Sequence, residues 1–410
     1  MMIGTGIRTT RRRGLWWTNN NSPSSVSWPW LIVLCTCVSL LYTHRRNRAI
    51  FDHENASNNM NKMINNDLSA QSMALCAAAK KVRLACFVPT LFNSQNLVSL
   101  NAILQTWGKD CDTLRFITEP GGNSSFPPDL VLKSQSAQAQ IVVLQNLKFN
   151  GHVKQCVSPE IPNPCKHLWE KTWKSWLWMR EHAWDGEEAD YFLKIDDDAL
   201  PFLGNVRRYI AMKQWSPNEP HYFGHELFRE ANQSRSNYAS GAMYGVSRAA
   251  LEQMGNIFKD GMLPFSQELF HSQERNYTNI ICYDRPGGPE DFLFARCART
   301  INLVVEDTSD VLGRDSIILF PPGEAKRFAA KFWYRRGKPA NRTYKGSFSP
   351  IPLALHSRPL KSPALRREIY SSIQRLLAAL AKNDKVKIFN SKLYPRDFVE
   401  KVAQSLQMCG

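Results

Sequence analysis

The sequence has 410 residues, of which 43% are hydrophobic and 21% are charged, a composition that is typical of globular proteins and excludes a wholly disordered chain. The formal net charge of +16 suits anionic partners such as a membrane surface or a phosphorylated small molecule. The basic residues are scattered and form neither a zinc-finger spacing nor a basic helical stripe, so no nucleic-acid partner is predicted.

An apolar segment near the N-terminus predicts a membrane anchor. Residues 14–43 carry no charged side chain, and their apolar centre is WPWLIVLCTCVSLLY. As a helix this centre reaches about 22 Å, which fits a thin early-secretory membrane. Arginines on both sides leave a weak bias towards a cytosolic N-terminus. We therefore predict a cytosolic tail at 1–27 and a transmembrane signal anchor at 28–43. A cleaved signal peptide is the alternative, and it leaves the remainder in the same lumenal compartment.

Glycosylation acceptors and cysteines agree with an oxidising lumen. Asn-x-Ser/Thr tripeptides begin at Asn55, Asn123, Asn232, Asn276 and Asn341, and the cysteines beyond the anchor are Cys76, Cys86, Cys111, Cys156, Cys165, Cys282, Cys297 and Cys409. Sequence alone does not fix the connectivity of such a set. We predict local bridges that pair Cys86 with Cys111, Cys156 with Cys165, and Cys282 with Cys297. For the middle pair, a zinc site with His152 and His167 is the alternative.

The rest of the chain divides into a spacer, a main domain and an extension. Residues 44–80 are rich in Asn, Ser, Met and Ala without a sustained apolar period, which predicts a stem. Alternating strands and helices then favour an α/β sheet with parallel strands over 81–360, followed by a helical extension at 361–410. The predicted strands are 82–90, 113–119, 141–147, 191–195 and 301–305, and the predicted helices are 97–107, 168–182, 289–300 and 362–383.

The stretch YFLKIDDDALPF, residues 191–202, runs a buried strand into three consecutive aspartates. Adjacent carboxylates repel one another and resist burial unless a cation lies near them. Sites in α/β sheets lie at the carboxyl ends of strands, and on extended backbone Asp196 and Asp198 point to the same side. The triplet therefore predicts a divalent cation that keeps open positions for phosphate oxygens. The alternative is an acidic loop or a helix N-terminus, because a helix is expected to begin near Gly204.

Several motifs occur in one order: W-E-K-T-W, ADYFLKIDDDA, YASGAMYGVSRAAL, GGPEDFLFARCA, DTSDVLGRDSIILFPP, FWY and LALH. This order resembles the β1,3-galactosyltransferase family, and within it most closely the core 1 enzymes, which are glycoprotein-N-acetylgalactosamine 3-β-galactosyltransferases. The resemblance runs from VRLACFVPT and LQTWGKDCD to about His356. It implies a nucleotide-sugar transferase fold of GT-A type, with a Rossmann-like α/β sheet behind the membrane anchor and 81–360 as the catalytic domain. It also implies UDP-galactose, manganese and a single-pass type II location in the Golgi membrane.

The resemblance assigns a metal and donor site to the acidic triplet. It implies that Asp196, Asp198 and His356 bind Mn²⁺, with Asp198 the foremost ligand, and that Asp196 and Asp197 contribute to the donor site. Manganese accepts mixed oxygen and imidazole ligands and would neutralise the diphosphate as UDP leaves. Without the resemblance, His356 would more often be an ordinary structural histidine.

The second carboxylate pair lies in GGPEDFLFARC, where Gly287 and Gly288 would let the backbone pass close to a sugar. Carboxylates at the start of a helix have an ordinary explanation, because they oppose the helix dipole. By resemblance, Asp291 is the general base that takes the proton of the attacking hydroxyl, and Glu290 is its neighbour in the substrate site. A single carboxylate base suffices for an inverting transfer.

Four further residues match family positions near the ligands. Trp107 and Gly108, in QTWGKD, match a stretch near the nucleotide, and Trp333 and Tyr334 match an aromatic pair near the acceptor. Aromatic faces stack on sugars and bases, although a Trp–Tyr pair is more often core packing.

The predicted function is inverting transfer of galactose from UDP-galactose to the 3-hydroxyl of N-acetylgalactosamine on Ser or Thr of glycoproteins. The chain reads SGAMYG where the family usually reads SGGAGY, which puts Ala242 and Met243 beside the expected donor pocket and affects donor choice. Alternatives are a Fringe-type β1,3-glycosyltransferase that uses N-acetylglucosamine and a non-catalytic, chaperone-like relative that binds a protein client. The intact triplet, Asp291 and His356 favour catalysis. Assembly as a homodimer is one option that the sequence does not decide.

Overall fold

The computed structural model describes residues 71–90, 94–119, 131–133, 138–145, 147, 168–182, 189–231, 234–264, 282–284, 289–310, 313–324, 348–349, 351–382 and 388–408. They belong to one compact unit, Ala70–Gly410. The predicted tail and anchor, the glycosylation acceptors, and the Cys156–Cys165 pair with its flanking histidines lie outside these ranges. Within them, no helix has the length and apolar character needed to cross a membrane.

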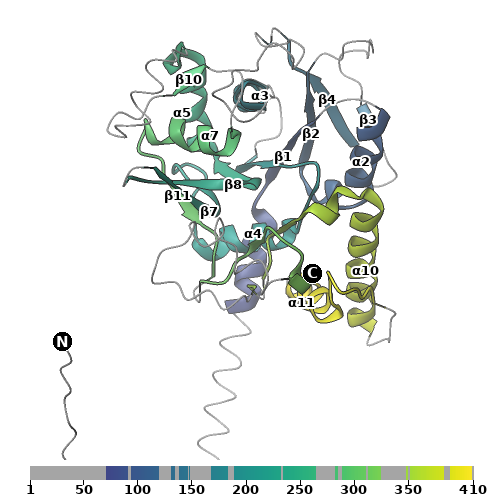
Figure 1. The fold of residues 1–410 in the computed structure, drawn as a ribbon. Helices are drawn as coiled ribbons and strands as arrows, with labels where there is room; N and C mark the ends of the chain where they lie inside the picture. Colours follow the sequence, from purple (N-terminus) through teal and green to yellow (C-terminus); the bar gives the residue numbers. More distant parts are fainter. Residues whose placement is uncertain are drawn as a thin grey trace, which may run out of the picture. The chain divides into compact units, whose positions relative to one another are not determined.

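A mixed eight-stranded sheet forms the centre of the unit, in the order β11-β7-β8-β5-β1-β2-β4-β3 (Figure 1). Its strands are β1 (Leu84–Pro89), β2 (Thr113–Thr118), β3 (Val131–Lys133), β4 (Gln138–Val143), β5 (Tyr191–Ile195), β7 (Tyr222–Ala231), β8 (Ser234–Ser247) and β11 (Val305–Asp307). The central strands β4, β2, β1 and β5 are parallel, whereas β8 runs antiparallel to both β5 and β7. The predicted α/β class with a parallel sheet is thus confirmed for the centre, and an antiparallel pair, β7 and β8, extends it.

Strand β1 shows how the sequence builds a layer on each face of this sheet. Leu84, Cys86 and Val88 point into one hydrophobic cluster and Ala85 and Phe87 into another, as the two-residue period of a strand requires. The first cluster is completed by α2 (Ser94–Gln105), α4 (Leu203–Lys213), α10 (Pro363–Lys382) and α11 (Arg396–Gln407), and the second by α3 (Leu168–His182), α5 (Arg248–Asn256) and α7 (Glu290–Arg299). Figure 1 shows the two groups of helices apart.

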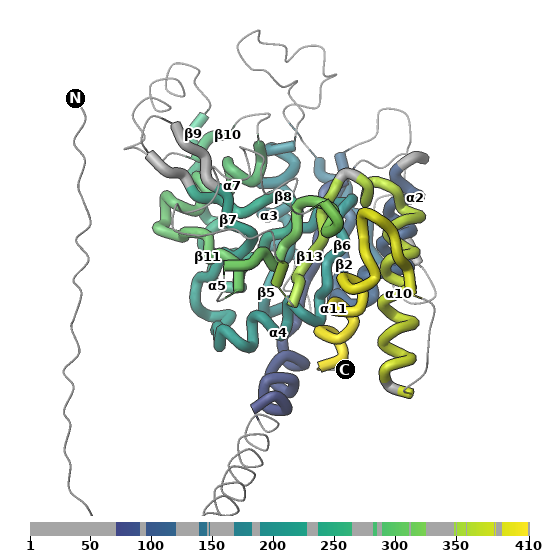
Figure 2. Tube along the Cα trace, turned by 60° about the horizontal axis from the view of Figure 1, so that its bottom comes forward, coloured from purple at the N-terminus to yellow at the C-terminus, as the bar shows by residue number. Residues whose placement is uncertain are grey.

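Both ends of the described chain differ from the predicted boundaries. Ile369 and Ile373 of α10, and Val399 and Val402 of α11, are buried in the same cluster as β1, so the helical extension shares the main core. Helix α10 packs against α2 and α11 (Figure 2). Residues 71–81, QSMALCAAAKK, are helical where the stem was predicted to continue to 80, because alanine, the best helix former, dominates this stretch.

A second, three-stranded sheet, in the order β12-β13-β6, brings a distant segment to the end of β5. It contains β6 (Ala199–Pro201), β12 (Ile317–Ile318) and β13 (Ala354–His356). Strand β6 begins one residue after the aspartate triplet, and its antiparallel pairing places His356 opposite Ala199. The remaining short elements are η1 (Trp107–Asp110), η3 (Ile257–Gly261), β9 (Leu263–Pro264), β10 (Tyr283–Asp284), η4 (Pro322–Glu324) and η5 (Arg358–Lys361).

The predicted strand at 301–305 is displaced. Residues 300–302 form the turn that ends α7, and the amide of Leu303 still donates to the carbonyl of Ala298. Asn302 adopts a left-handed conformation with φ of 60°, which is a common way to end a helix. The apolar residues of this stretch therefore cap α7, and strand β11 begins only at Val305.

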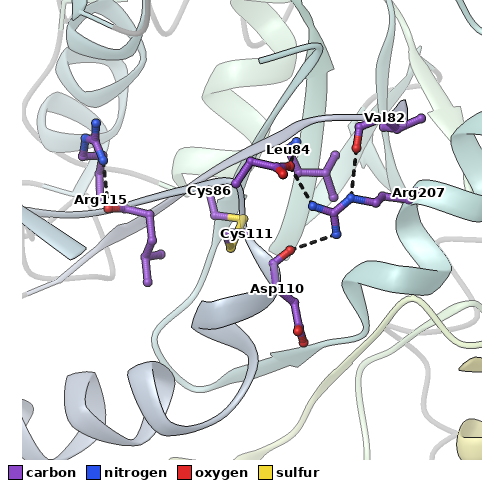
Figure 3. Close-up of a disulfide and its surroundings, with 9 residues drawn as sticks. Val82, Leu84, Cys86, Asp110, Cys111, Arg115 and Arg207 are labelled. Carbon is purple, nitrogen blue, oxygen red and sulfur yellow. Dashed lines mark hydrogen bonds and ion pairs between the residues drawn. A yellow bond between two sulfur atoms is a disulfide. The ribbon is translucent and has the colours of Figure 1, made fainter. Parts of the chain in front are cut away.

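Two of the predicted disulfides are confirmed, Cys86–Cys111 and Cys282–Cys297. The first ties β1 to the residue after η1 (Figure 3). Beside it, the Arg207 guanidinium donates to the carbonyl oxygens of Val82, at 2.9 Å, and Asp110, at 2.8 Å. The bridge and the arginine together hold the beginning of β1, a central strand, against η1 and α4.

Candidate metal and catalytic site

Asp196, Asp198 and His356 lie together at the carboxyl end of β5. His356 Nε2 is 3.0 Å from Asp198 Oδ1 and 3.6 Å from Asp196 Oδ2. One ligand atom from each residue can be chosen so that all lie within 4.8 Å of one another. The aspartates follow β5, and the pairing of β13 with β6 supplies the histidine. The structure therefore brings together the three residues that the sequence predicted as metal ligands.

This donor set fits a divalent cation. Two carboxylates and one imidazole suit Mn²⁺, which accepts mixed oxygen and nitrogen ligands. Burial lowers the pKa of His356, but its hydrogen bond to Asp198 and the charges of Asp196 and Asp198 outweigh burial and raise it. Burial raises the pKa of Asp198, but the hydrogen bond and the charge of His356 outweigh it and lower the pKa. The carboxylates thus attract positive charge to this point.

Asp197 faces a different neighbour. Its Oδ2 accepts a hydrogen bond of 3.2 Å from the hydroxyl of Thr90, at the end of β1, and its carbonyl accepts one of 3.3 Å from Ser99 Oγ on α2. Burial raises the pKa of Asp197, and the charges of Asp198 and Asp196 raise it further. Asp197 therefore links the triplet to β1 and α2, while its two neighbours face the histidine.

The predicted base, Asp291, is held at the start of α7. Its Oδ2 accepts a hydrogen bond of 3.0 Å from the amide of Gly241 on β8, and its Oδ1 accepts one of 2.8 Å from the amide of Phe292. Burial raises the pKa of Asp291, although these two amides oppose the shift. The preceding residue, Glu290, is also buried, and its Oε2 accepts a hydrogen bond of 3.1 Å from the Tyr244 hydroxyl. Burial raises the pKa of Glu290, against the attraction of Lys194.

Lys194, on β5, connects the two carboxylate sites. Its Nζ donates to Asp196 Oδ1 at 2.5 Å, to Glu290 Oε1 at 2.6 Å and to the carbonyl of Gly241 at 2.8 Å. Burial lowers the pKa of Lys194, but Asp196 and Glu290 outweigh it and raise the pKa. The sequence analysis missed both Lys194 and Gly241. The available signal was a lysine inside a strand that is otherwise apolar, because a buried charge requires partners.

Two further buried cations near the triplet were also missed. Lys171 of α3 donates to the carbonyl of Thr90 at 3.1 Å, and burial lowers its pKa. Arg366 of α10 donates through Nη2 to Ser99 Oγ, while its Nε and Nη1 have no hydrogen-bond partner among the described residues. Burial lowers the pKa of Arg366, although the charges of Asp197 and Asp198 oppose the shift. No pattern in the sequence of either helix pointed to these two residues.

The four residues that were predicted to contact the nucleotide or the acceptor take no part in the hydrogen-bonded groups around Lys194 and His356, or they lie outside the described ranges. Trp107 is completely buried in the hydrophobic cluster of β1, and a Cβ at Gly108 would come within 2.9 Å of the Ile103 carbonyl oxygen. This close packing alone explains why a tryptophan and a glycine occupy these two positions. Their contact with the nucleotide stays a prediction. Met243, which departs from the family pattern, is also buried in this cluster. Trp333 and Tyr334 lie outside the described residues.

No protein-family model matches the chain. Among solved structures, the chain is similar to the glycosyltransferase GlyE of Streptococcus pneumoniae TIGR4, with 10% identity and a TM-score of 0.33 over 77% of this chain and 65% of GlyE. It is similar to the galactosyltransferase LgtC in complex with donor and acceptor sugar analogues, with 12% identity and a TM-score of 0.36 over 67% of this chain and 87% of LgtC. It is also similar to mouse xyloside xylosyltransferase 1, with 7% identity and a TM-score of 0.32 over 68% of this chain and 97% of the xylosyltransferase. The chain spans 65% of the length of GlyE, and at these TM-scores the likeness carries no functional conclusion.

Proposed function

We propose that the protein is an inverting, metal-dependent β1,3-glycosyltransferase that moves galactose from UDP-galactose to the 3-hydroxyl of N-acetylgalactosamine on Ser or Thr of glycoproteins. The observation that carries the proposal is the grouping of Asp196, Asp198 and His356 within 4.8 Å, joined through Lys194 to the element that holds Asp291. The choice of donor and acceptor rests on the resemblance of the motifs to core 1 enzymes.

The acidic triplet and His356 would bind the donor end of the reaction. Asp196, Asp198 and His356 would hold Mn²⁺, which when bound supplies positive charge to the diphosphate leaving group. Asp197 stabilises the loop because its carboxylate accepts a hydrogen bond from the Thr90 hydroxyl. The residues of this loop therefore position the nucleotide, while proton transfer is left to another group.

Asp291 is suited to accept that proton. Each carboxylate oxygen of Asp291 accepts a hydrogen bond from a backbone amide. Each oxygen keeps a second lone pair that can accept a hydrogen bond from the hydroxyl of the acceptor sugar. Its raised pKa brings it closer to the range in which a general base works well at neutral pH. In the transfer, the acceptor oxygen bonds to the anomeric carbon, the bond from that carbon to UDP breaks, and the hydroxyl proton passes to Asp291. Direct displacement inverts the anomeric centre.

A transfer assay tests the proposed function. The full-length protein in detergent is supplied with UDP-galactose or other UDP-sugars and with glycopeptides that carry N-acetylgalactosamine, in Mn²⁺ or in EDTA. We expect galactose transfer that requires the metal. Transfer of N-acetylglucosamine instead would favour the Fringe-type alternative, and the absence of transfer from every donor would favour a non-catalytic, client-binding protein.

We also propose that the protein is a single-pass type II protein of the Golgi membrane, anchored by residues 28–43 with its folded unit in the lumen. The uncharged segment and the Asn-x-Ser/Thr tripeptides support this location. Enzymatic deglycosylation of the protein from cells should lower its mass. An unchanged mass, together with a C-terminus that antibodies reach after selective permeabilisation of the plasma membrane, would contradict it.

A further inference from the structure

We propose that Lys194 is a positioning residue that fixes the metal-binding carboxylate of Asp196 and the start of α7, which carries Asp291, in one arrangement. Lys194 donates to an acceptor from the loop after β5, to one from β8 and to one from α7. These three segments meet at a single buried ammonium group, which is 1% exposed. The inference rests on the proposed function, because the metal and base roles come from there.

The contacts of Asp196 are divided between its two oxygens. Oδ1 accepts a hydrogen bond of 2.5 Å from Lys194, and Oδ2 lies 3.6 Å from His356 Nε2. The carboxylate plane is thereby fixed with Oδ2 towards His356 and Asp198. A metal ligand that is oriented by a hydrogen bond of this kind binds more tightly, because less of its freedom is lost on binding.

Lys194 is also connected, through Glu290 and Gly241, to Asp291. Lys194 donates to Glu290 Oε1 and to the Gly241 carbonyl, and the amide of the same Gly241 donates to Asp291 Oδ2. Glu290 is further fixed by the Tyr244 hydroxyl at 3.1 Å. Lys194 thus bonds to both the residue before Asp291 and the residue whose amide holds Asp291.

The composition of this cluster argues against a role in stability alone. Ion pairs in a protein interior often stabilise no better than apolar residues of the same volume, because taking both charges out of water is costly. Here one ammonium is shared by two carboxylates from different segments, and the side chain of Glu290 is only 6% exposed. An arrangement that gains little stability but orients both carboxylates is expected where geometry matters for function.

The test compares a double variant, which keeps the net charge of the cluster, with a single variant that retains Lys194. Lys194→Met alone would leave Glu290 buried without its partner and could unfold the protein, so the informative variant is Lys194→Met combined with Glu290→Gln. Glu290→Gln alone is the matched control, because it retains the Lys194–Asp196 contact. Thermal unfolding establishes that both variants are folded, and the affinity for Mn²⁺ alone is measured by electron paramagnetic resonance of the free ion.

We expect the double variant to bind Mn²⁺ about 10- to 100-fold more weakly than Glu290→Gln, the usual effect of removing the partner of a metal ligand. In hydrogen exchange, the peptide that contains Gly241 should exchange faster in the double variant than in the control. Equal Mn²⁺ affinity in the two variants, or a wild-type protein that binds no Mn²⁺, would overturn the inference. If the metal results follow expectation but no UDP-sugar is used, only the proposed function fails.

Discussion

His356 Nε2 lies 3.0 Å from Asp198 Oδ1, although 158 residues separate them in the chain. The contact depends on a short antiparallel pairing, in which His356 is opposite Ala199. The strand that pairs with β13, which carries the imidazole, is β6, and it begins immediately after the aspartates. This candidate metal site is assembled by tertiary structure, and its parts can be tested separately.

Asp198 and Asp291 are expected to carry separable roles. Asp198→Ala removes one of the proposed metal ligands, so the affinities for Mn²⁺ and for UDP should fall together and turnover should nearly vanish. Asp291→Asn keeps the size of the side chain but cannot accept a proton, so Mn²⁺ and UDP should still bind while transfer falls by about 10²-fold or more. Calorimetry of UDP with Mn²⁺, run beside a transfer assay, measures both effects. Near-wild-type turnover in Asp291→Asn would show that another group is the base.

The Asp198–His356 pair predicts a pH dependence of stability in Mn²⁺-free buffer. The pKa of His356 is raised above 6.5, so its contribution is full below that value and is lost as the pH rises through the raised pKa. The pKa of Asp198 is lowered below 3.8, so its contribution is full above that value and is lost as the pH falls through the lowered pKa. Both contributions are therefore present between these two values.

His356→Gln provides the comparison. The free energy of unfolding, measured with urea, should exceed that of the variant most at about pH 4–6, and this difference should shrink as the pH is raised to about 9. In the wild-type protein, added Mn²⁺ should instead make the free energy of unfolding increase as the pH rises, because the metal binds the neutral imidazole. A difference between the two proteins that is constant over this range would contradict the pairing.

The sequence analysis succeeded where local pattern determines structure. The helix at 168–182 and the strand at 191–195 were predicted with the bounds that the structure has, because the helix repeats large apolar residues at helical spacing and the strand is a short, mostly apolar run. The strand at 301–305 was misplaced because a left-handed Asn302 turns its apolar residues into a helix cap. His356 entered only through the family resemblance, since no local pattern encodes the pairing of β13 with β6. Lys194 was missed because its partners lie on β8 and α7, which are distant in sequence.

Arg366, which is buried, and Arg207, which is partly buried, are predicted to respond in opposite ways to the same substitution. Arg366 is 1% exposed, and its Nε and Nη1 have no hydrogen-bond partner among the described residues. Burial outweighs the attraction of Asp197 and Asp198 in lowering its pKa. Arg366→Met should therefore leave the free energy of unfolding unchanged or raise it by about 1 kcal/mol or more, because it removes an incompletely paired buried charge.

Arg207→Met is the matched comparison. The Arg207 guanidinium donates to the carbonyls of Val82 and Asp110 (Figure 3). It also donates to Asp112 Oδ2 at 2.7 Å. Its removal takes one donor away from each of these acceptors, although Asp112 Oδ2 keeps the Leu84 amide, and should lower the free energy of unfolding by about 1–3 kcal/mol. Urea unfolding measures the free energy of unfolding of both variants. An equal loss of stability in the two would mean that the Arg366 guanidinium is fully hydrogen-bonded in solution.

Cys76 is predicted to pair with Cys409. Cys76 is disulfide-bonded, and its Sγ lies 3.0 Å from the carbonyl oxygen of Met408, the residue before Cys409. Cys409 itself lies outside the described residues. A bridge that closes so long a loop contributes about 6 kcal/mol in the loop-entropy model. Cys76→Ser and the double Cys76→Ser/Cys409→Ser variant should therefore lose the same stability. Peptide mapping without reduction that joins Cys76 to Cys156 or Cys165 would refute this pairing and the predicted Cys156–Cys165 bridge together.

Gly241→Ala is predicted to disturb the base more than the metal site. A Cβ at Gly241 would come within 2.8 Å of Glu290 Oε1, 3.5 Å of Asp291 Oδ2 and 3.6 Å of Lys194 Nζ. Glu290 cannot easily move away, because it is buried and bonded to both Lys194 and Tyr244. The start of α7 must shift instead, at a cost of about 1–3 kcal/mol in stability, which is usual for overpacking.

The three atoms nearest to the new methyl group belong to Glu290, Asp291 and Lys194 and not to Asp198 or His356, so Mn²⁺ affinity should fall less than the transfer rate. The control is Gly261→Ala, because the nearest atom to a Cβ there is a side-chain carbon of Ile257 at 3.7 Å, an ordinary van der Waals distance. Its stability should stay within about 0.5 kcal/mol of the wild-type value. Transfer rate, Mn²⁺ affinity and urea unfolding are measured for both variants. Wild-type transfer by Gly241→Ala would show that the position of Asp291 does not depend on close packing between β8 and α7.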